Sequence, residues 1–232
     1  MIIDLRPFKI PKKLPGKEAH LKLAPEHRVS SLTIEQTPPA NARESAVLVV
    51  LTPKKVQNVL VQNILEWSVL LIKRNTYHGT HSGQIAFPGG KCEEYDADHI
   101  ATACREAFEE VGVKRDEVNI LGHLTKLYVP PSNFTIYPVL AIDKGIQEFR
   151  LEPREVTEFM QIPLKMFDPK NAERCRVLGG PNEWVYAPGY VIDGNIIWGA
   201  TAMILSELYE VADEIEKIVL ANLINSSSKL EL

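Results

Sequence analysis

Three glutamates that would fall within about one turn of a helix, Glu106, Glu109 and Glu110, are the residues of this chain best suited to chemistry. Carboxylates three or four residues apart on a helix repel each other, which costs roughly 0.2–0.5 kcal/mol per pair. A hard divalent cation such as Mg²⁺ or Mn²⁺ prefers oxygen ligands and would turn this repulsion into binding. Arg105 could orient one carboxylate through a bidentate contact. The spacing favours a metal site, and the alternative is a solvated acidic helix face.

A helix that ends at Gly112 would position these acids. At about 100° per residue, its apolar side chains gather on one arc and its charged side chains on the opposite arc. The apolar arc holds Ile100, Ala103, Cys104, Ala107, Phe108 and Val111, and the charged arc holds Arg105, Glu106, Glu109 and Glu110. Asp96 or Asp98 can cap the first turn, and Gly112 suits the left-handed position after the last turn.

Two segments upstream of this helix also carry candidate site residues. Gly89 and Gly90 form a turn whose backbone can come close to a metal ion because neither residue has a side chain. The backbone carbonyl of Gly90 is therefore a candidate ligand. Lys73 and Arg74 lie at the end of a predicted strand, where alternation allows only one of the two to face the cleft.

The helix segment resembles the signature of the Nudix hydrolases. That pattern runs Gly, five residues, Glu, seven residues, then Arg-Glu-hydrophobic-x-Glu-Glu-x-Gly-hydrophobic. Residues 105–113 match its second half at every fixed position. The first half departs from the pattern, because Asp96 stands where the pattern has Glu and the distance from Gly90 to Arg105 is longer by one residue.

In both of these differences the chain resembles the coenzyme A diphosphatase branch of the family, which has the longer loop and an Asp in place of the Glu. The upstream signature of the branch matches this chain at Leu70-Leu71, Arg74, Gly83 and Phe87-Pro88-Gly89-Gly90. Three members of that signature are missing, because the chain has Ile72 for Thr, Asn75 for Ser or Ala, and Gly79 for a second Arg. Segments resembling the branch continue downstream, at residues 130–131, 137–139, 155–156 and 198–202, so that the resemblance covers residues 45–210.

The resemblance implies metal-dependent hydrolysis of a diphosphate linkage in a small nucleoside diphosphate derivative. Coenzyme A or an acyl-CoA is the expected substrate, giving adenosine 3′,5′-bisphosphate and a phosphopantetheine. The implied ligands of Mg²⁺ or Mn²⁺ are Glu106, Glu109, Glu110 and Gly90, and the implied substrate-binding residues are Arg74, Gly89 and Arg105. The catalytic residues would be Glu106, Glu109 and Glu155, with the general base either Glu106 or Glu155. His78 and His81 are further candidates for contact with substrate phosphate.

Two other functions stay open. Gly79 replaces a cation of the branch signature, so the substrate could instead be another nucleoside diphosphate derivative such as ADP-ribose or a dinucleotide. A non-catalytic binding module with the same fold is disfavoured, because all the helix carboxylates are present and degraded modules tend to lose them.

Composition excludes several further classes. The 232 residues carry 26 Lys and Arg against 30 Asp and Glu, a net charge of −4, which argues against a general nucleic-acid binder. Cys92, Cys104 and Cys175 show no paired spacing and no Cys-x-x-Cys, so the sequence implies neither a disulfide framework nor zinc. Residues 1–45 contain no apolar run suited to a signal peptide or a membrane helix, which makes the cytoplasm the expected location.

Strand patterns begin after a proline-containing N-terminal extension, residues 1–45. Strands are predicted over 46–51, 68–72, 85–87, 118–129 and 135–142, with a hairpin over 190–198 whose type I′ turn is Asp193-Gly194. A helix over 200–224 carries an apolar face that would serve the core or, alternatively, a homodimer seam. Strands with one site helix and one closing helix predict an α/β sandwich. The resemblance refines this to a Nudix-type α/β/α sandwich with a mixed curved sheet, over residues 46–225, followed by a polar tail, 226–232.

Overall fold

A computed structural model describes residues 10–29, 37–56, 59–60, 63–75, 83–146, 148–180 and 183–227. Its helices are α1 (Lys17–Lys22), α3 (His99–Val111) and α4 (Gly199–Ser227). The main sheet contains β1 (Arg43–Thr52), β4 (Ser68–Arg74), β5 (Ile85–Ala86), β6 (Gly89–Lys91), β7 (Val118–His123), β8 (Leu127–Val129), β9 (Phe134–Asp143) and β10 (Val156–Pro163). A second sheet contains β11 (Glu173–Gly180), β12 (Glu183–Ile192) and β13 (Asn195–Trp198), and β2 (Lys55–Val56) pairs with β3 (Val59–Leu60). Short 3₁₀ helices span Glu26–Arg28, Ile64–Glu66, Arg115–Glu117, Pro130–Ser132, Leu164–Phe167 and Pro169–Asn171.

The main sheet is mixed. Its strand order is β10-β4-β1-β9-β7, with β5 on β4, β6 on β1 and β8 on β9. Strands β1 and β9 run parallel, and the other pairs are antiparallel. The parallel pair lies at the centre, where both faces are buried, and this explains the continuous apolar run of β1.

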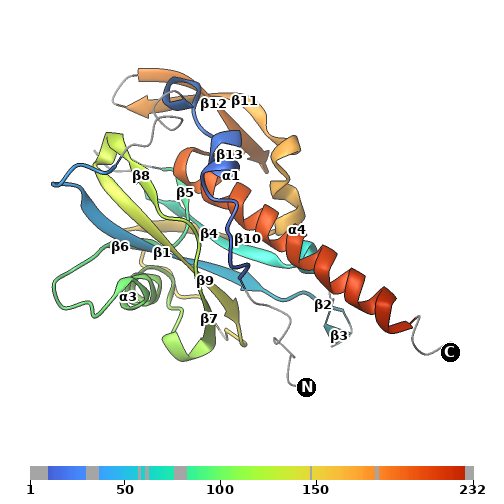
Figure 1. Ribbon diagram of the computed structural model, residues 1–232. Helices are drawn as coiled ribbons and strands as arrows, with labels where there is room; N and C mark the ends of the chain where they lie inside the picture. The colour runs from blue at the N-terminus through green and yellow to red at the C-terminus, as the bar shows by residue number, and fades with distance from the viewer. Residues whose placement is uncertain are drawn as a thin grey trace.

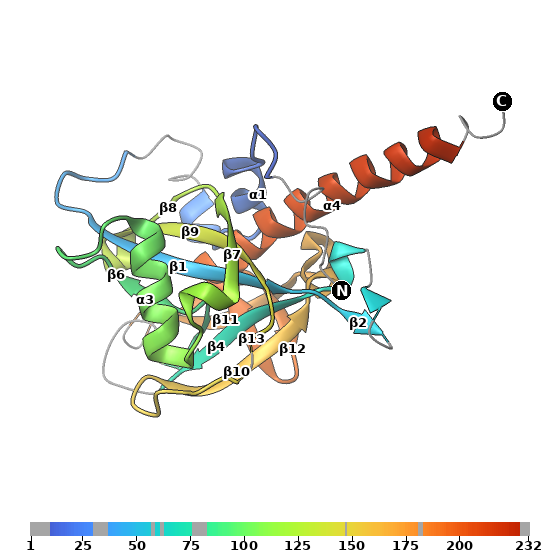
Figure 2. The ribbon, with the colours of Figure 1, turned by 90° about the horizontal axis from the view of Figure 1, so that it is seen from below.

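Alternation along the central strands divides the core into two layers. Leu48 and Val50 of β1 pack toward α3, whereas Val49 and Leu51 pack toward α4. Figure 1 shows α3 on one side of the sheet and α4 on the other, and the view from below in Figure 2 places α3 in front of β1 and β4 with α4 behind them. The predicted α/β/α sandwich with a mixed sheet is confirmed.

The predicted hairpin at residues 190–198 is present in β12 and β13. Its two turn residues, Asp193 and Gly194, both have positive φ, 48° and 76°, as a type I′ turn requires. The predicted strand over 118–129 is instead two strands, because the chain leaves the sheet between β7 and β8. A register shift between Ile120 and Gly122 accompanies this break. Strands β10 and β11 were not predicted.

Helix α4 closes the second face of the sheet. Ile204, Leu208 and Val211 are buried in the core, in agreement with one of the two roles foreseen for its apolar face. Further along, Ile218 is 52% exposed, and the end of the helix extends past the sheet in Figure 1. The helix is longer than predicted and reaches Ser227, within the expected polar tail.

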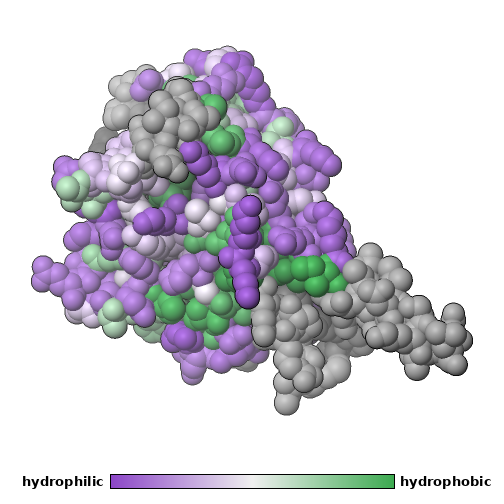
Figure 3. Space-filling model, viewed as in Figure 1, coloured by the Kyte–Doolittle hydropathy of each residue, from purple (hydrophilic) through white to green (hydrophobic). Residues whose placement is uncertain are grey.

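The N-terminal region packs on the domain through α1, which contacts α4. Ala19 and Leu23 are fully buried. Strand β1 begins at Arg43, three residues before the predicted start of the folded domain. Figure 3 shows hydrophilic residues over most of one face of the molecule, with hydrophobic residues in separate patches. Within the described residues, none of the helices is both long enough and apolar enough to cross a bilayer.

Candidate active site

Capping residues fix both ends of helix α3, which carries the three acids. Asp98 caps the first turn, because its Oδ1 accepts from the N–H of Ala101 at 2.7 Å. Gly112 adopts φ 77° at the other end, a left-handed conformation that suits glycine. Of the two caps left open by the sequence, Asp98 is the one used. Asp96 takes a different role, in the loop before the helix.

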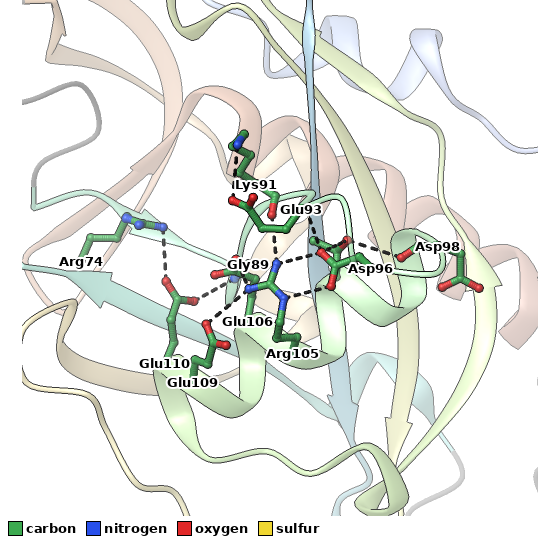
Figure 4. Close-up of polar contacts among 11 residues, drawn as sticks. Arg74, Gly89, Lys91, Glu93, Asp96, Asp98, Arg105, Glu106, Glu109 and Glu110 are labelled. Carbon is green, nitrogen blue, oxygen red and sulfur yellow. Dashed lines mark hydrogen bonds and ion pairs between the residues drawn. The ribbon is translucent and has the colours of Figure 1, made fainter.

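Arg105 ties that loop to the acids of the helix (Figure 4). Its Nε and Nη2 donate to the two carboxylate oxygens of Asp96, at 3.0 and 2.9 Å. Its Nη1 donates to Glu106 at 2.7 Å and to Glu109 at 3.3 Å, and Nη2 also reaches the carbonyl of Lys91 at 3.0 Å. The hydrogen bonds from Arg105 lower the pKa of Asp96 well below its usual range. Arg105 therefore orients carboxylates, as the sequence suggested, and Asp96 is the residue that fixes Arg105.

Glu110 is the buried acid of the helix, with a side chain only 1% exposed. Its Oε2 accepts from the backbone N–H of Gly89 at 2.8 Å, and its Oε1 lies 3.5 Å from a guanidinium nitrogen of Arg74. Burial raises the pKa of Glu110 to about 7, against the opposing effects of Arg74 and Gly89. Burial also raises the pKa of Glu106, although its contact with Arg105 opposes the shift.

Two residues of the helix lie on a different side from the one predicted. Glu110 was placed on the charged arc, but seven residues correspond to almost two full turns, which brings it within ~20° of buried Ala103. Phe108 was placed on the apolar arc but is 46% exposed. It lies about 100° from Ala107, at the far edge of the buried face. The burial of Glu110 thus follows from helix geometry.

Gly89 and Gly90 bring the backbone of β6 against Glu106 and Glu110, the two inner acids of the helix. A Cβ on Gly89 would lie 2.5 Å from the carbonyl oxygen of Ala46, so the close pairing of β6 with β1 requires glycine. A Cβ on Gly90 would lie 2.4 Å from the carboxyl carbon of Glu106. Gly89 is a predicted substrate-binding residue, and in this structure its N–H donates to Glu110.

Glu109 is more peripheral than the other two acids. Its side chain is 56% exposed, and Arg105 contacts it. The ligand atoms of Glu106, Glu109 and Glu110 do not all lie within 4.8 Å of one another. Among the described residues only Glu44, Cys92 and His99 form so tight a group of three. The three acids are still coupled, because after the larger effect of burial Glu109 raises the pKa of Glu106 and Glu106 raises that of Glu110.

Arg74 and Lys73 face opposite sides of β4, as alternation requires. Arg74 points toward α3 and Glu110, and its Nε is buried without a hydrogen-bond partner among the described residues. Lys73 donates from Nζ to Asn195 at 3.0 Å, at the start of β13. Arg74 is thus the cation on the side of the acids. His78, Gly79 and His81 lie outside the described residues.

Glu155 reaches the same region from the loop before β10. Its carbonyl accepts from the N–H of Asn75 at 2.7 Å, which joins this loop to the end of β4. Its side chain is exposed, and its negative charge contributes to the raised pKa of both Glu106 and Glu110 after the larger effect of burial. The structure therefore brings Glu155 near the two inner acids, although it is 45 residues from Glu110 in the sequence.

The donor set around the inner acids fits Mg²⁺ or Mn²⁺. The available ligands are carboxylate oxygens, which these hard cations prefer. Glu110 Oε1 is buried and accepts no hydrogen bond from the residues that the structure describes. The absence of a side chain at Gly90 keeps the Glu106 carboxylate beside the backbone of β6. Glu106, Glu110 and the backbone at Gly90 would hold the ion, with Glu109 at the rim.

The sequence is similar to one known protein family over much of its length. The family model of the NUDIX domain matches residues 42–177. The Nudix hydrolase NudL of Yersinia enterocolitica is 32% identical over 188 residues, covering 78% of this chain and 89% of NudL. NudL of Yersinia pestis is 34% identical over 147 residues, covering 62% of this chain and 71% of that protein.

The chain also resembles solved structures, at low sequence identity. A Nudix hydrolase from M. smegmatis, RenU, has a TM-score of 0.49 at 15% identity, covering 75% of this chain and 88% of RenU. A MutT/nudix family protein from Enterococcus faecalis has a TM-score of 0.46 at 16% identity, covering 85% of this chain and 73% of that protein. Since the family model matches more than half of the chain and NudL aligns with most of it, the chain belongs to the Nudix hydrolase family.

Proposed function

We propose that this Nudix hydrolase cleaves the diphosphate of coenzyme A or an acyl-CoA with water. The products are adenosine 3′,5′-bisphosphate and 4′-phosphopantetheine or its acyl derivative. The family assigns the reaction class, hydrolysis of a nucleoside diphosphate derivative. The choice of coenzyme A rests on the loop length and the motifs at Arg74, Gly83 and residues 87–90, which resemble that branch.

The observation that carries the proposed chemistry is the setting of Glu110. A carboxylate with 1% exposure lies against the Gly89 N–H and the Arg74 guanidinium, beside a second partly buried acid, Glu106. Burying two acids together is costly unless cations compensate their charge. When bound, a divalent cation neutralises diphosphate charge and lowers the pKa of water. Arg74 would bind a phosphate oxygen of the substrate from the neighbouring strand.

Glu155 is our choice for the general base. The Glu106 carboxylate accepts a hydrogen bond from Arg105 Nη1 at 2.7 Å, so that oxygen is not free to take a proton from water in this geometry. Glu155 is exposed, it is close enough to influence Glu106 and Glu110 electrostatically, and its backbone is held by Asn75. In this assignment Glu155 takes a proton from the attacking water, while Arg105 keeps Glu106 and Glu109 in position.

A substrate panel tests the proposal. The enzyme is assayed with coenzyme A, acetyl-CoA, ADP-ribose, diadenosine polyphosphates and NADH, with Mg²⁺ or Mn²⁺, and the products are identified by mass. We expect coenzyme A and acetyl-CoA to have the highest kcat/KM and to be cut within the diphosphate. A preference for ADP-ribose of tenfold or more would replace coenzyme A with the broader substrate class.

The variant Gly79→Arg restores the cation of the branch signature and sharpens the same test. A charge-assisted contact contributes about 1.5–3 kcal/mol, which corresponds to roughly 10- to 150-fold in affinity. We therefore expect Gly79→Arg to raise kcat/KM for coenzyme A more than for ADP-ribose, with Gly79→Gln as the uncharged control of similar reach. An unchanged ratio between the two substrates would contradict a coenzyme A site at this position.

A further inference from the structure

A second group of metal-ligating side chains lies beside the loop that leads into α3. Glu44 comes from the start of β1, Cys92 directly follows β6, and His99 is the first residue of α3. One ligand atom from each lies within 4.8 Å of the others, and this is the tightest such group of three within the described segments. The cysteine spacing alone implied no zinc, and these three residues, 48 and 7 positions apart, form no recognisable ligand motif in the sequence.

Neighbouring side chains already orient two of these ligands. The ring of His99 stacks on Tyr137, with ring centroids 3.6 Å apart and planes inclined by 9°. The Tyr137 hydroxyl donates to Glu44 Oε1 at 2.9 Å, which leaves Glu44 Oε2 directed at His99 Nε2, 3.0 Å away. Tyr137 of β9 thus fixes both the imidazole plane and the carboxylate oxygen that faces it, as outer partners do in protein metal sites.

The distances suit a tetrahedral ion. With metal–nitrogen and metal–oxygen bonds of about 2.0–2.2 Å, a nitrogen and an oxygen ligand of tetrahedral zinc lie ~3.3 Å apart. The observed 3.0 Å between His99 Nε2 and Glu44 Oε2 needs little adjustment. A sulfur and a nitrogen ligand would lie ~3.6 Å apart, and Cys92 Sγ lies within 4.8 Å of both other ligand atoms, so rotation about the Cys92 Cα–Cβ bond would complete the set.

We propose that Glu44, Cys92 and His99 form a second metal site, which binds Zn²⁺ or a similar borderline-soft divalent ion. A thiolate, an imidazole and a carboxylate are the ligand types that zinc selects, whereas Mg²⁺ avoids sulfur. Three protein ligands leave one position for water, and the partial exposure of all three side chains gives the ion access. The nearby His123, whose ring centroid lies 6.4 Å from that of His99, stays outside the group.

This site would brace the active-site helix from its N-terminal end. Glu44 belongs to the central sheet, His99 to α3, and Cys92 to the loop whose Asp96 fixes Arg105. The backbone N–H of Cys92 already donates to the carbonyl of Glu44 at 3.0 Å. An ion shared by the three residues would hold loop, helix and sheet together, without itself contacting the carboxylates of Glu106 and Glu110.

Cobalt substitution tests the proposal, because a thiolate ligand gives Co²⁺ a near-ultraviolet charge-transfer absorption that carboxylate ligands do not produce. The full-length protein is titrated with Co²⁺ in the presence of excess Mg²⁺, which prefers oxygen sites. We expect one equivalent of Co²⁺ to give the thiolate absorption, and one equivalent of Zn²⁺ to remove it. Absence of the absorption at saturating Co²⁺, or its loss on raising Mg²⁺ alone, would overturn the proposal.

Variants assign the signal to the three residues. Cys92→Ser should abolish the absorption, and Glu44→Gln and His99→Gln should each weaken Co²⁺ binding by tenfold or more. Tyr137→Phe should weaken it about 10- to 100-fold, because it removes only the outer hydrogen bond. Cys175→Ser and His123→Gln are matched controls that should retain wild-type binding. Persistence of the absorption in Cys92→Ser would overturn the proposal, as would unchanged affinity in His99→Gln.

The same titration separates this site from the proposed diphosphatase centre. Glu110→Gln should leave the thiolate absorption and its affinity unchanged, because Glu110 belongs to the other group of acids. Thermal unfolding of each variant, recorded in parallel, shows that loss of signal is not loss of fold. A Glu110→Gln protein that also lost the cobalt signal while remaining folded would contradict two separate metal sites.

Discussion

At the scale of single residues, Glu110 is a buried acid whose carboxyl pKa is shifted most by its loss of contact with water. Burial raises its pKa to about 7, so the fold gains little from its negative charge. Glu110→Gln keeps the shape and the oxygen that accepts from the Gly89 N–H, but it removes the ligand charge. We expect kcat to fall by at least about 100-fold with the free energy of unfolding preserved, measured by steady-state kinetics and urea denaturation.

Glu94→Gln is the control for this change. Glu94 is an exposed acid in the loop before the same helix, and surface substitutions of this kind usually change stability by less than about 0.5 kcal/mol. Its kcat should match the wild type. Near-normal turnover of Glu110→Gln, or full activity of the wild type in EDTA, would remove the argument for a metal at the helix acids.

The same Glu-to-Gln change at Glu155 tests the role of general base. If it accepts a proton from water, Glu155→Gln should lower kcat by about 100-fold or more, while KM and unfolding change little, because the side chain is exposed. The neighbouring Glu152→Gln is the matched control. A kcat within twofold of the wild type would assign Glu155 to the surface and leave Glu106 as the alternative base.

At the scale of elements, strand β6 and helix α3 depend on glycine in two different ways. At Gly90 a methyl group would displace the Glu106 carboxylate, a flexible side-chain end, so folding should survive while the acid moves. At Gly112 a methyl group strains a residue with φ 77° and crowds the N–H of Arg150 at 3.1 Å, so the fold should suffer and the site should not.

The two alanine variants should therefore show opposite patterns. Gly90→Ala should lower kcat by about 100-fold with little loss of stability, since displacements of an ångström have effects of that size. Gly112→Ala should lower the free energy of unfolding by about 1–2 kcal/mol and keep kcat. Kinetics and urea unfolding on both proteins check this. If both variants lost stability and kcat to the same extent, Gly90 would not act specifically on the acid, nor Gly112 specifically on the fold.

Local signals were enough to predict α3 and the β12–β13 turn. Gly112 and the Asp193-Gly194 pair each predict backbone with positive φ, which few other residue types adopt, and all three residues have positive φ in the structure. Strand β10 could not be found this way. Only Val156 and Ile162 among its residues are buried, so it lacks the alternation that marks a strand with one buried face. It forms because β4 offers it a free edge.

At the scale of the whole molecule, contacts between distant parts of the chain complete the fold, and no local sequence pattern predicts them. Glu44, Cys92 and His99 meet only because β1, β6 and α3 are neighbours. His20 of α1 and Glu207 of α4 are 187 positions apart, yet His20 Nε2 lies 3.0 Å from Glu207 Oε2 in a buried contact. Nearby, the Ser206 hydroxyl donates to the carbonyl of Ala19 at 2.9 Å. The N-terminal region is thus fastened to the helix that closes the sheet.

The buried contact between His20 and Glu207 predicts a specific dependence of stability on pH. Burial alone would raise the pKa of Glu207, but hydrogen bonds from His20 and from the N–H of Thr125 outweigh it and hold the pKa below the ordinary value of 4.5. A carboxylate with a lowered pKa in the folded state stabilises the protein above its unfolded pKa, and that stabilisation is lost as pH falls through the folded pKa. Glu207→Gln should therefore lower the free energy of unfolding by about 1.5–3 kcal/mol near neutral pH.

The difference between wild type and Glu207→Gln should narrow as the pH falls below 4.5, because the wild-type carboxylate then takes up its proton. Urea unfolding over a pH series measures it. Glu210→Gln is the control on the same helix, since Glu210 pairs with Lys22 of α1 at 2.9 Å but half of that lysine is exposed, and such pairs contribute about 0–1 kcal/mol. A difference that widened in acid, or a Glu210→Gln loss as large as that of Glu207→Gln, would show that the buried pair is not what secures the N-terminal region to α4.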